Sequence, residues 1–427
     1  MTVVGDPSQK SLTREQKEAV GILSIGTFLE YLDLKIYIHL AVMLNPLFFP
    51  PTDPFSASMI SAFAFCTSFI FRPFGGLLFG WLGDNIGRKN TIFLTTFFMG
   101  GSCFIMFILP EYSQIGIWAS VIMILCRIIQ GMSSLGEVIG AKLYISESIK
   151  APMSYAMLQI VTIGAILGGS AAIFLSKTVI DTTGNWRYIF LIGSIIAFLG
   201  LIFRTRLRET QDFVDATKRL EKKQIIEQKI DRKLLLSYFF MRCISPFSIY
   251  VSFAYAPVLL KKHGYTMSEI LSQNFGVTLV DVLFTTCLIY FSYKFHPLRI
   301  LKFLTMIYVP ILLILIPCLD LYCNPTMIFI FQVFTMCCNP GTRPAEPIIY
   351  KSFPVFKRFK AASIIFALAG AVMYIISSFG VEFITSVYGE IGLYIIAIPL
   401  AVSYIWGLNN FINKEKEKGT YSVFNTI

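Results

Sequence analysis

The chain has 427 residues, of which 55% are hydrophobic, 15% aromatic and 14% charged, and its formal net charge is +11. Because a soluble globular protein carries about 25% charged residues, this composition excludes that class and indicates an integral membrane protein. The basic balance does not require a nucleic-acid partner, since cytoplasmic loops of membrane proteins accumulate Lys and Arg. The nine cysteines form no CxxC pair and have no histidine at metal-ligand spacing. We therefore expect no metal, no cofactor, no catalytic residue and no enzyme activity.

Twelve apolar stretches follow a polar N-terminal segment, each near the roughly 20 residues that cross a bilayer. The ninth and tenth are interrupted by several prolines, which are tolerated where a cavity or neighbouring helices satisfy the freed backbone groups. These prolines are Pro310, Pro317, Pro340, Pro344 and Pro347. The chain is predicted to be an all-α multi-pass membrane protein. The expected spans are residues 19–41, 57–80, 90–110, 115–141, 154–176, 187–204, 234–260, 271–292, 301–319, 325–349, 361–383 and 389–412.

Basic residues gather in alternate loops, which sets the expected orientation and domain organisation. The loops around residues 88–89, 150, 294–299 and 357–360 are basic, whereas the intervening loops hold almost no Lys or Arg. Cytoplasmic loops carry this excess, so both termini are expected in the cytoplasm. A long polar insertion divides the spans into two sets of six. The predicted organisation is an N-terminal six-helix bundle at residues 1–204, a cytoplasmic interbundle loop at 205–233 and a C-terminal six-helix bundle at 234–427.

A glycine-rich stretch, GWLGDNIGRK at residues 80–89, joins the second and third expected spans. Its glycines would let the helices approach closely and the backbone turn sharply. Its acidic and basic residues, four apart, place opposite charges where the membrane ends. We expect a tight cytoplasmic turn. The residues that form it are Gly80, Gly83, Asp84, Gly87 and Arg88.

The first expected span carries two carboxylates near one face at mid-depth, Glu30 and Asp33, with Tyr37 a further turn outward. Two carboxylates in a low-dielectric site repel each other, and burial also opposes their ionisation. The pair would therefore hold a proton and release it when water or a cation arrives. The alternative is a structural hydrogen-bonded pair. The stem of Lys35 is expected to reach the outer interface.

The fourth expected span carries Arg127 about 18 Å below its outer end, at 1.5 Å per residue. An unpaired arginine at that depth is prohibitive, so we hypothesise that Glu30 or Asp33 is its partner. Glu137 lies about 15 Å further towards the cytoplasm, where it is expected to serve an inner gate. Glu147, at the end of the span, is expected either to pair with Arg88 or to be an exposed interfacial charge.

The second half carries fewer membrane charges. Asp281 lies in the middle of its span without a partner nearby in the sequence, which makes it the best candidate for the transport site from this half. Arg343 and Glu346 are three residues apart and are expected to neutralise each other. Arg72 and Arg242 are further charges within the expected spans.

Several of these motifs resemble known transporters. The turn matches the G-x-L-x-D-x-x-G-R-K signature of the major facilitator transporters. More narrowly, the chain resembles their metabolite:proton symporter branch, which includes proline/betaine and organic-acid carriers. The matching motifs are Gly26, Glu30, Asp33 and Tyr37 with Phe48-Phe49-Pro50, Arg72-Pro73-Phe74-Gly75-Gly76, Arg127-x-x-Gln130-Gly131, Gly136-Glu137, Trp186-Arg187, Arg208-Glu209-Thr210 and Phe353-Pro354. The departures are Asn85 in the turn, Lys35, Lys351, and Tyr293 with His296 in the second half's counterpart of the turn.

The resemblance implies a cell inner-membrane carrier whose two bundles rock about a central cavity. In that family the turn locks the cytoplasmic side, and its acidic residue docks at the start of the eleventh helix, here Ala361-Ala362-Ser363. The residues expected at the gate are Gly80, Gly83, Asp84, Gly87, Arg88, Glu137 and Glu147. Those expected to carry protons or contact the substrate are Glu30, Asp33, Tyr37, Arg127, Gln130 and Asp281.

The function expected is proton-driven uptake of a small polar metabolite, with the proton gradient in place of a cofactor. A zwitterionic osmolyte such as proline or glycine betaine is favoured, because carboxylates and tyrosines suit a compact cationic group. An organic acid is the alternative, with Arg127 and Arg343 binding its carboxylates. A non-transporting sensor on a transporter fold is a further alternative. The expected partners are the solute, protons and the lipid bilayer, with no nucleic acid, and the chain is expected to function as a monomer.

Overall fold

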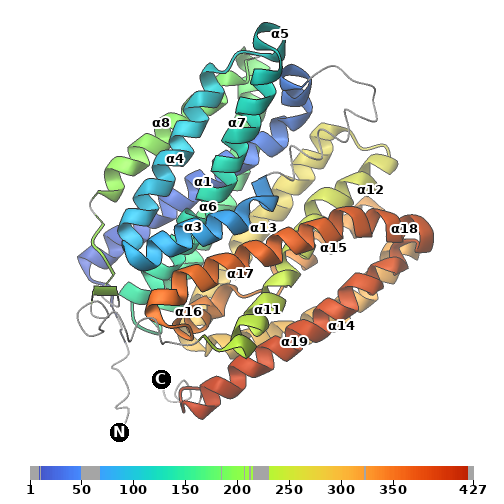
Figure 1. Ribbon diagram of the computed structural model, residues 1–427. Coiled ribbons are helices and arrows are strands. Elements are labelled where there is room, and N and C mark those ends of the chain that lie inside the picture. Colours follow the sequence, from blue (N-terminus) through green and yellow to red (C-terminus); the bar gives the residue numbers. More distant parts are fainter. Residues whose placement is uncertain are drawn as a thin grey trace.

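The computed structural model describes residues 9, 11–49, 68–183, 185–205, 207–210, 213–214, 230–321 and 324–421. Its N-terminal half, blue to green in Figure 1, lies beside its C-terminal half, yellow-green to red. The helices of the N-terminal half are α1 (Arg14–Phe48), α3 (Arg72–Asn85), α4 (Arg88–Ile108), α5 (Tyr112–Ile115), α6 (Ile117–Ser148), α7 (Met153–Thr183) and α8 (Arg187–Arg204). The predicted all-α multi-pass fold is confirmed.

The C-terminal half repeats the pattern of long helices but breaks several of them. Two π-helical turns, η1 and η3, and two 3₁₀ turns, η2 and η4, join its straight segments. The elements are α11 (Arg232–Tyr250), η1 (Val251–Tyr255), α12 (Ala256–Lys262), α13 (Met267–Lys294), α14 (Pro297–Leu321), α15 (Pro325–Cys337), η2 (Arg343–Ala345), α16 (Glu346–Lys351), α17 (Val355–Ile375), η3 (Ile376–Val381), α18 (Glu382–Tyr388), η4 (Glu390–Leu393) and α19 (Tyr394–Glu417).

Within the described residues, nine helices are long and apolar enough to cross a membrane. Three of the twelve expected spans are not among these nine helices. The first corresponds to α1. The second, at 57–80, is described only from residue 68, and the tenth is represented by α15, which has 13 residues. The expected domain boundaries fall where α8 ends and α11 begins. Most of the loop at 205–233 is not described, so the three-part division stays a prediction.

The tenth span, expected to run unbroken over 325–349, is interrupted in the structure. Helix α15 ends at Cys337, and the chain resumes as a 3₁₀ turn at Arg343. Pro340 lacks the N–H that a continuing helix requires, and Gly341 has φ +45°, a conformation that glycine adopts without strain. The hydroxyl of Tyr404 in α19 donates to the freed Gly341 carbonyl at 2.8 Å. A neighbouring helix therefore satisfies the break.

The outer surface of the bundle is apolar, as a lipid-facing surface must be. Large side chains such as Trp118 (65% exposed), Phe303 (63%) and Phe383 (68%) point away from the protein. Inside, small residues let helices approach closely. A Cβ on Gly407 of α19 would lie only 2.7 Å from the Ser237 carbonyl oxygen of α11. Close packing of this kind holds α3 beside α17 (Figure 1), which positions the site described next.

Candidate functional site

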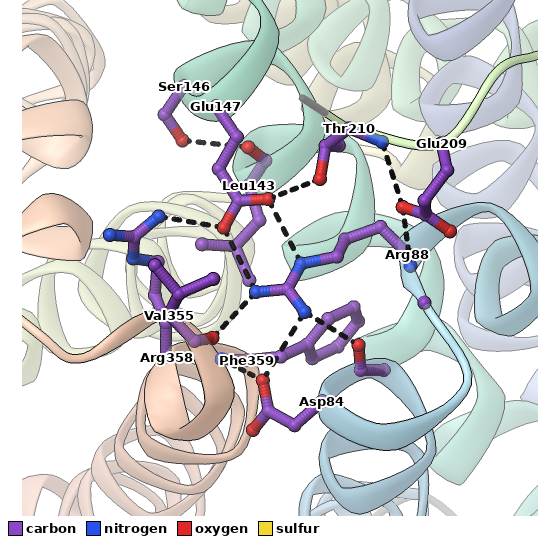
Figure 2. A network of polar contacts seen from close by, with 12 residues as sticks. Asp84, Arg88, Leu143, Ser146, Glu147, Glu209, Thr210, Val355, Arg358 and Phe359 are labelled. Atoms are coloured by element: carbon purple, nitrogen blue, oxygen red, sulfur yellow. Dashed lines mark hydrogen bonds and ion pairs between the residues drawn. The ribbon is translucent and has the colours of Figure 1, made fainter. Parts of the chain in front are cut away.

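Arg88, at the start of α4, is the centre of a buried polar network at the end of the bundle where α3 meets α4 (Figure 2). Its side chain is fully buried, and its guanidinium donates from Nε and Nη2 to the two oxygens of Glu147, at 3.0 Å each. It also donates to the carbonyls of Gly83 and Val355, at 2.8 Å each. The ion pair expected between Arg88 and Glu147 is present. Two oxygens facing one guanidinium give a strong and directional contact.

The network joins the two halves of the chain. Arg358 of α17 donates to Glu147 of α6 at 2.8 Å, and Asp84 of α3 accepts from the backbone N–H groups of Phe359 (3.1 Å) and Lys360 (2.9 Å). We call Asp84, Arg88, Glu147 and Arg358 the cytoplasmic gate. The name follows the orientation expected from the loop charges. Since each of the gate's carboxylates contacts both halves, the two halves are closed against each other at this end of the bundle (Figure 2).

The docking point of Asp84 differs from the one expected. The resemblance places it at Ala361-Ala362-Ser363, but the carboxylate binds the two preceding N–H groups, those of Phe359 and Lys360. The reason is that α17 begins at Val355, six residues before the expected start of the eleventh span. Phe359 and Lys360 are therefore the fifth and sixth residues of α17, and their N–H groups donate to the carboxylate where α3 packs closely on α17.

Two glycines of the turn make this docking possible. A Cβ on Gly80 would lie 2.7 Å from the Cα of Lys360, and a Cβ on Gly83 would overlap the ring of Phe359. Gly87 has φ +98°, a conformation strained for any residue with a side chain. The three glycines are thus required by close approach or by backbone conformation in the closed state.

Three residues of this network were not foreseen from the sequence: Arg358 of the gate itself, and Glu209 and Thr210 beside it. Glu209 accepts from the backbone N–H groups of Arg88 (3.0 Å) and Lys89 (3.2 Å), at the positive end of α4. The hydroxyl of Thr210 donates to Glu147 at 2.7 Å. Both residues belong to the motif Arg208-Glu209-Thr210, whose match to the family was the available signal. The motif lies about 120 positions from the glycine-rich turn in the sequence, so spacing alone could not predict their contact.

A second ion pair crosses the halves closer to the middle of the membrane. Lys142 of α6 binds Glu346 at 2.8 Å, and Arg343 binds Asp281 of α13 at 3.0 Å. The expected neutralisation of Arg343 by Glu346 is therefore wrong. Arg343 lies in the 3₁₀ turn η2 and Glu346 begins α16, so the two residues do not share the face of one regular α-helix.

Glu137 lies away from the cytoplasmic gate at which it was expected. It forms an ion pair with Arg204, the last residue of α8, and accepts from the hydroxyls of Thr95 and Thr96 of α4. Glu137 and Glu30 both line a small cavity of about 20 Å³ inside the N-terminal half, which is room for about one water molecule. Glu137 does not belong to the gate, because its ion-pair partner is Arg204, whose long side chain extends into the N-terminal half.

Arg127 is buried in the N-terminal half, with 1% of its surface exposed, and donates to Gln130 at 2.9 Å. Gln130 in turn contacts the sulfur of Cys103 at 3.4 Å, and Cys103 lines the same small cavity as Glu30. The structure therefore brings Glu30, Arg127 and Gln130 into one region. The side chains of Asp33 and Tyr37 lie outside the described part, so the partner hypothesised for Arg127 stays a prediction.

Between the halves at mid-membrane lies a set of aromatic and charged side chains that we call the central interface. The guanidinium of Arg72 lies 4.9 Å from the Phe69 ring centroid, and that ring packs on Tyr374 of α17 at 4.6 Å. The guanidinium of Arg242 in α11 lies 4.1 Å from the ring centroid of Phe366. The set consists of Tyr31, Lys35, Phe69, Arg72, Lys142, Arg242, Arg343, Glu346, Phe366 and Tyr374.

The described residues include no group of three or more His, Cys, Asp or Glu side chains that could hold a metal ion. The carboxylates of this part of the molecule can exchange protons, and its guanidinium and aromatic side chains can bind a small polar solute.

The chain is similar in sequence to known and putative transport proteins. The chain is 34% identical over 213 residues to a proline/betaine transporter of Salmonella typhimurium, a match that covers 48% of this chain and 42% of the relative. It is 28% identical over 403 residues to a putative metabolite transport protein of Haemophilus influenzae, covering 89% of this chain and 91% of the relative. The chain thus matches less than half the length of the proline/betaine transporter.

Solved structures share the fold at low sequence identity. A proton:xylose symporter superposes with a TM-score of 0.73 at 16% identity, over 94% of this chain and 95% of that one. A human organic anion transporter superposes with a TM-score of 0.69 at 12% identity, over 94% and 100%. A sequence model of the Major Facilitator Superfamily matches residues 23–380. With its all-helical fold and its glycine-rich turn closed on the eleventh helix, the chain belongs to the Major Facilitator Superfamily of transporters.

Proposed function

We propose that the protein is a secondary active transporter that takes up a small polar metabolite together with protons. The observation that carries this proposal is the cytoplasmic gate, in which buried charges join the two halves at one end. A buried ion pair is a poor source of net stability, so its retention at the junction favours a role in a contact that forms and breaks. Alternating access requires such a contact.

The proton carriers proposed are Glu30 and Asp33, with Arg127 as a fixed positive charge. Glu30 is 1% exposed, and Arg127 is equally buried. Burial of a carboxylate favours its neutral form, whereas a nearby cation or water favours its charged form. Its protonation state therefore depends on which side of the membrane has access. Gln130 and Tyr37 are proposed to support this site, and Asp281 to contribute from the other half.

Two substrate classes are candidates. The proline/betaine transporters among the relatives support a zwitterionic osmolyte. An organic acid is favoured by a specific observation, the number of arginine and lysine side chains in the central interface. We further propose that the protein lies in the cell inner membrane with both termini cytoplasmic and functions as a monomer without a cofactor.

Uptake into proteoliposomes tests the proposal. Labelled proline, glycine betaine and succinate would each be offered with and without an inward proton gradient. Gradient-stimulated uptake of one of them by the wild type, abolished in Asp33→Asn, is expected. Uptake that ignores the gradient would contradict proton coupling. Failure of folded protein to take up any of the three would favour the non-transporting sensor.

A further inference from the structure

Arg72 and Arg242 lie deep in the membrane on opposite halves of the molecule. About 18 Å of helix separates Arg72 from Asp84 of the gate, and about 15 Å separates Arg242 from the start of α11, at ~1.5 Å per residue. Both side chains are half-buried. An arginine at this depth is costly unless it pairs or faces water, so each needs a specific reason to be there.

Both guanidiniums lie against aromatic rings that meet on α17. Arg242 lies 4.1 Å from the ring centroid of Phe366, and Arg72 lies 4.9 Å from that of Phe69, which packs on Tyr374. The rings of Phe69 and Phe366 each support one guanidinium from the side. The arrangement places one arginine from each half, both held by aromatic faces, beside α17.

Neither arginine forms an ion pair within the part of the chain that is described, and the Nε atom of each is buried without a hydrogen-bond partner there. The other cations of the central interface differ. Lys142 is bound to Glu346, and Arg343 to Asp281. A buried donor without a hydrogen-bond partner is unfavourable. Fold stability alone therefore does not explain why both arginines are present.

The charges of this region do not balance. Lys35 lies within electrostatic range of Arg72, and Lys142 within range of Arg242 and Arg343. The cations are Lys35, Arg72, Lys142, Arg242 and Arg343. The described carboxylates of the same region are Asp281 and Glu346, so five cations face two carboxylates. Glu30 lies with the buried Arg127 and adds no net negative charge. The surplus calls for a negative charge from outside the chain.

We infer that Arg72 and Arg242 form a carboxylate subsite shared by the two halves, and that the transported solute carries net negative charge, as a dicarboxylate does. The guanidinium fork matches a carboxylate with two parallel N–H donors. A quaternary ammonium would instead need a free aromatic face, but Phe366 is already flanked by Arg242 and Lys142. The inference rests on the proposed transport function and decides between its two substrate classes.

A carboxylate that bridges the two arginines would also link solute binding to the relative position of the two halves. It would contact α3 in one half and α11 in the other, so both contacts can be made at once only when the halves are close around the solute. Opening towards either side would separate the two arginines. The subsite thereby couples solute binding to the approach of the halves.

Binding measured on the purified, detergent-solubilised full chain tests this inference. Calorimetric titration with succinate, proline and glycine betaine would compare the wild type with Arg72→Gln and Arg242→Gln. Succinate is expected to bind more tightly than either zwitterion, and each variant to weaken it at least about tenfold, the loss of one charge-assisted contact. Arg72→Lys and Arg242→Lys should retain part of the affinity. Arg14→Gln, whose side chain is 93% exposed, is the matched control and should bind as the wild type does.

Two results would overturn the inference: succinate affinity unchanged in both Gln variants, or a zwitterion bound more tightly than succinate. The lysine variants separate loss of charge from loss of folding, because they keep the charge in place. Succinate binding that needs both arginines, without proton-driven uptake, would leave the subsite standing and remove the transport proposal. Uptake of a zwitterion that is equally fast in the wild type and in both Gln variants would support the transport proposal and remove the carboxylate subsite.

Discussion

At the scale of single residues, Glu147 is the carboxylate of the cytoplasmic gate that binds both of its arginines. Its two oxygens accept from Arg88, from Arg358 and from the hydroxyl of Thr210. These partners come from three parts of the chain, one of them in the other half. The physical consequence is that losing this carboxylate removes the ion-pair partner that two buried guanidiniums share.

Glu147→Gln should therefore destabilise the closed protein by about 3–5 kcal/mol, the cost of breaking a buried ion pair from one side. Thermal unfolding in detergent measures this as a lowered Tm. Glu18→Gln is the control, because Glu18 is 57% exposed and pairs with Arg14 on the surface, where such pairs contribute about 0–1 kcal/mol. Equal Tm values for the two variants would show that the gate is not formed.

Gly83→Ala tests the close approach of α3 to α17. The added methyl group would overlap the Phe359 ring, and overpacking of this kind costs about 1–3 kcal/mol. Hydrogen exchange at the amides of Phe359 and Lys360, which Asp84 protects, should become about tenfold faster. Gly101→Ala is the control, since no atom lies within 4 Å of its Cβ position. Unchanged exchange in Gly83→Ala would contradict the docking geometry.

The residues that the sequence singled out correctly share a short-range signal. Asp84, Arg88 and the glycines of the turn lie within ten positions and match a known signature, so their place at the gate could be inferred. Glu137 could not be placed, because its partner Arg204 lies 67 positions away. Nor could Arg343, whose partner Asp281 lies on another helix. Sequence spacing gives the depth of a membrane charge but not the neighbour it meets.

At the scale of elements, the second-half counterpart of the glycine-rich turn has a structural role. His296, between α13 and α14, packs its ring 5.0 Å from that of Tyr421, and Arg299 donates to the Tyr421 carbonyl at 3.1 Å. The turn therefore anchors the segment that follows α19. Its loss of the acidic residue and glycine of the first turn is consistent with this different function.

The buried His296 predicts a pH dependence of stability. Burial lowers the pKa of His296 from 6.5 to about 4, the nearby Arg299 adds to this, and Glu415 opposes it. The unfolded chain binds the proton below about pH 6.5, whereas the folded histidine stays neutral to about pH 4. The contribution is therefore present above pH 6.5 and is lost as the pH falls towards 4, by up to about 3 kcal/mol.

Thermal unfolding across this pH range checks the expectation. His296→Gln, which cannot take up the proton, should flatten the fall in Tm between pH 6.5 and 4. His263→Gln, at an exposed position, should retain the wild-type slope. A wild-type slope in His296→Gln would mean that another group is responsible.

The helices themselves were largely predictable, because about 20 apolar residues suffice to indicate a span. Their ends and breaks were not. The interruption after Cys337 depends on a proline and a glycine whose freed carbonyl is satisfied by Tyr404 from α19, a contact with no local signature. The start of α17 at Val355 likewise depends on the gate, because Arg88 binds the Val355 carbonyl.

At the scale of the whole molecule, the structure is one closed arrangement of two halves. The cytoplasmic gate and the pair of Lys142 with Glu346 hold the halves together on one side. The buried carboxylate Glu30 lies inside the N-terminal half, and the arginines of the central interface lie between the halves. The places proposed for proton binding and solute binding therefore differ from the gate but lie next to it, as a coupled carrier requires.

The most direct test of proton-coupled transport is the movement of protons with the solute. Proteoliposomes with a pH-sensitive dye inside would receive succinate, proline or glycine betaine outside, without an imposed gradient. The account predicts that the transported solute acidifies the interior in the wild type, and that Glu30→Gln and Asp33→Asn abolish the acidification. Solute entry without any change of internal pH would contradict it.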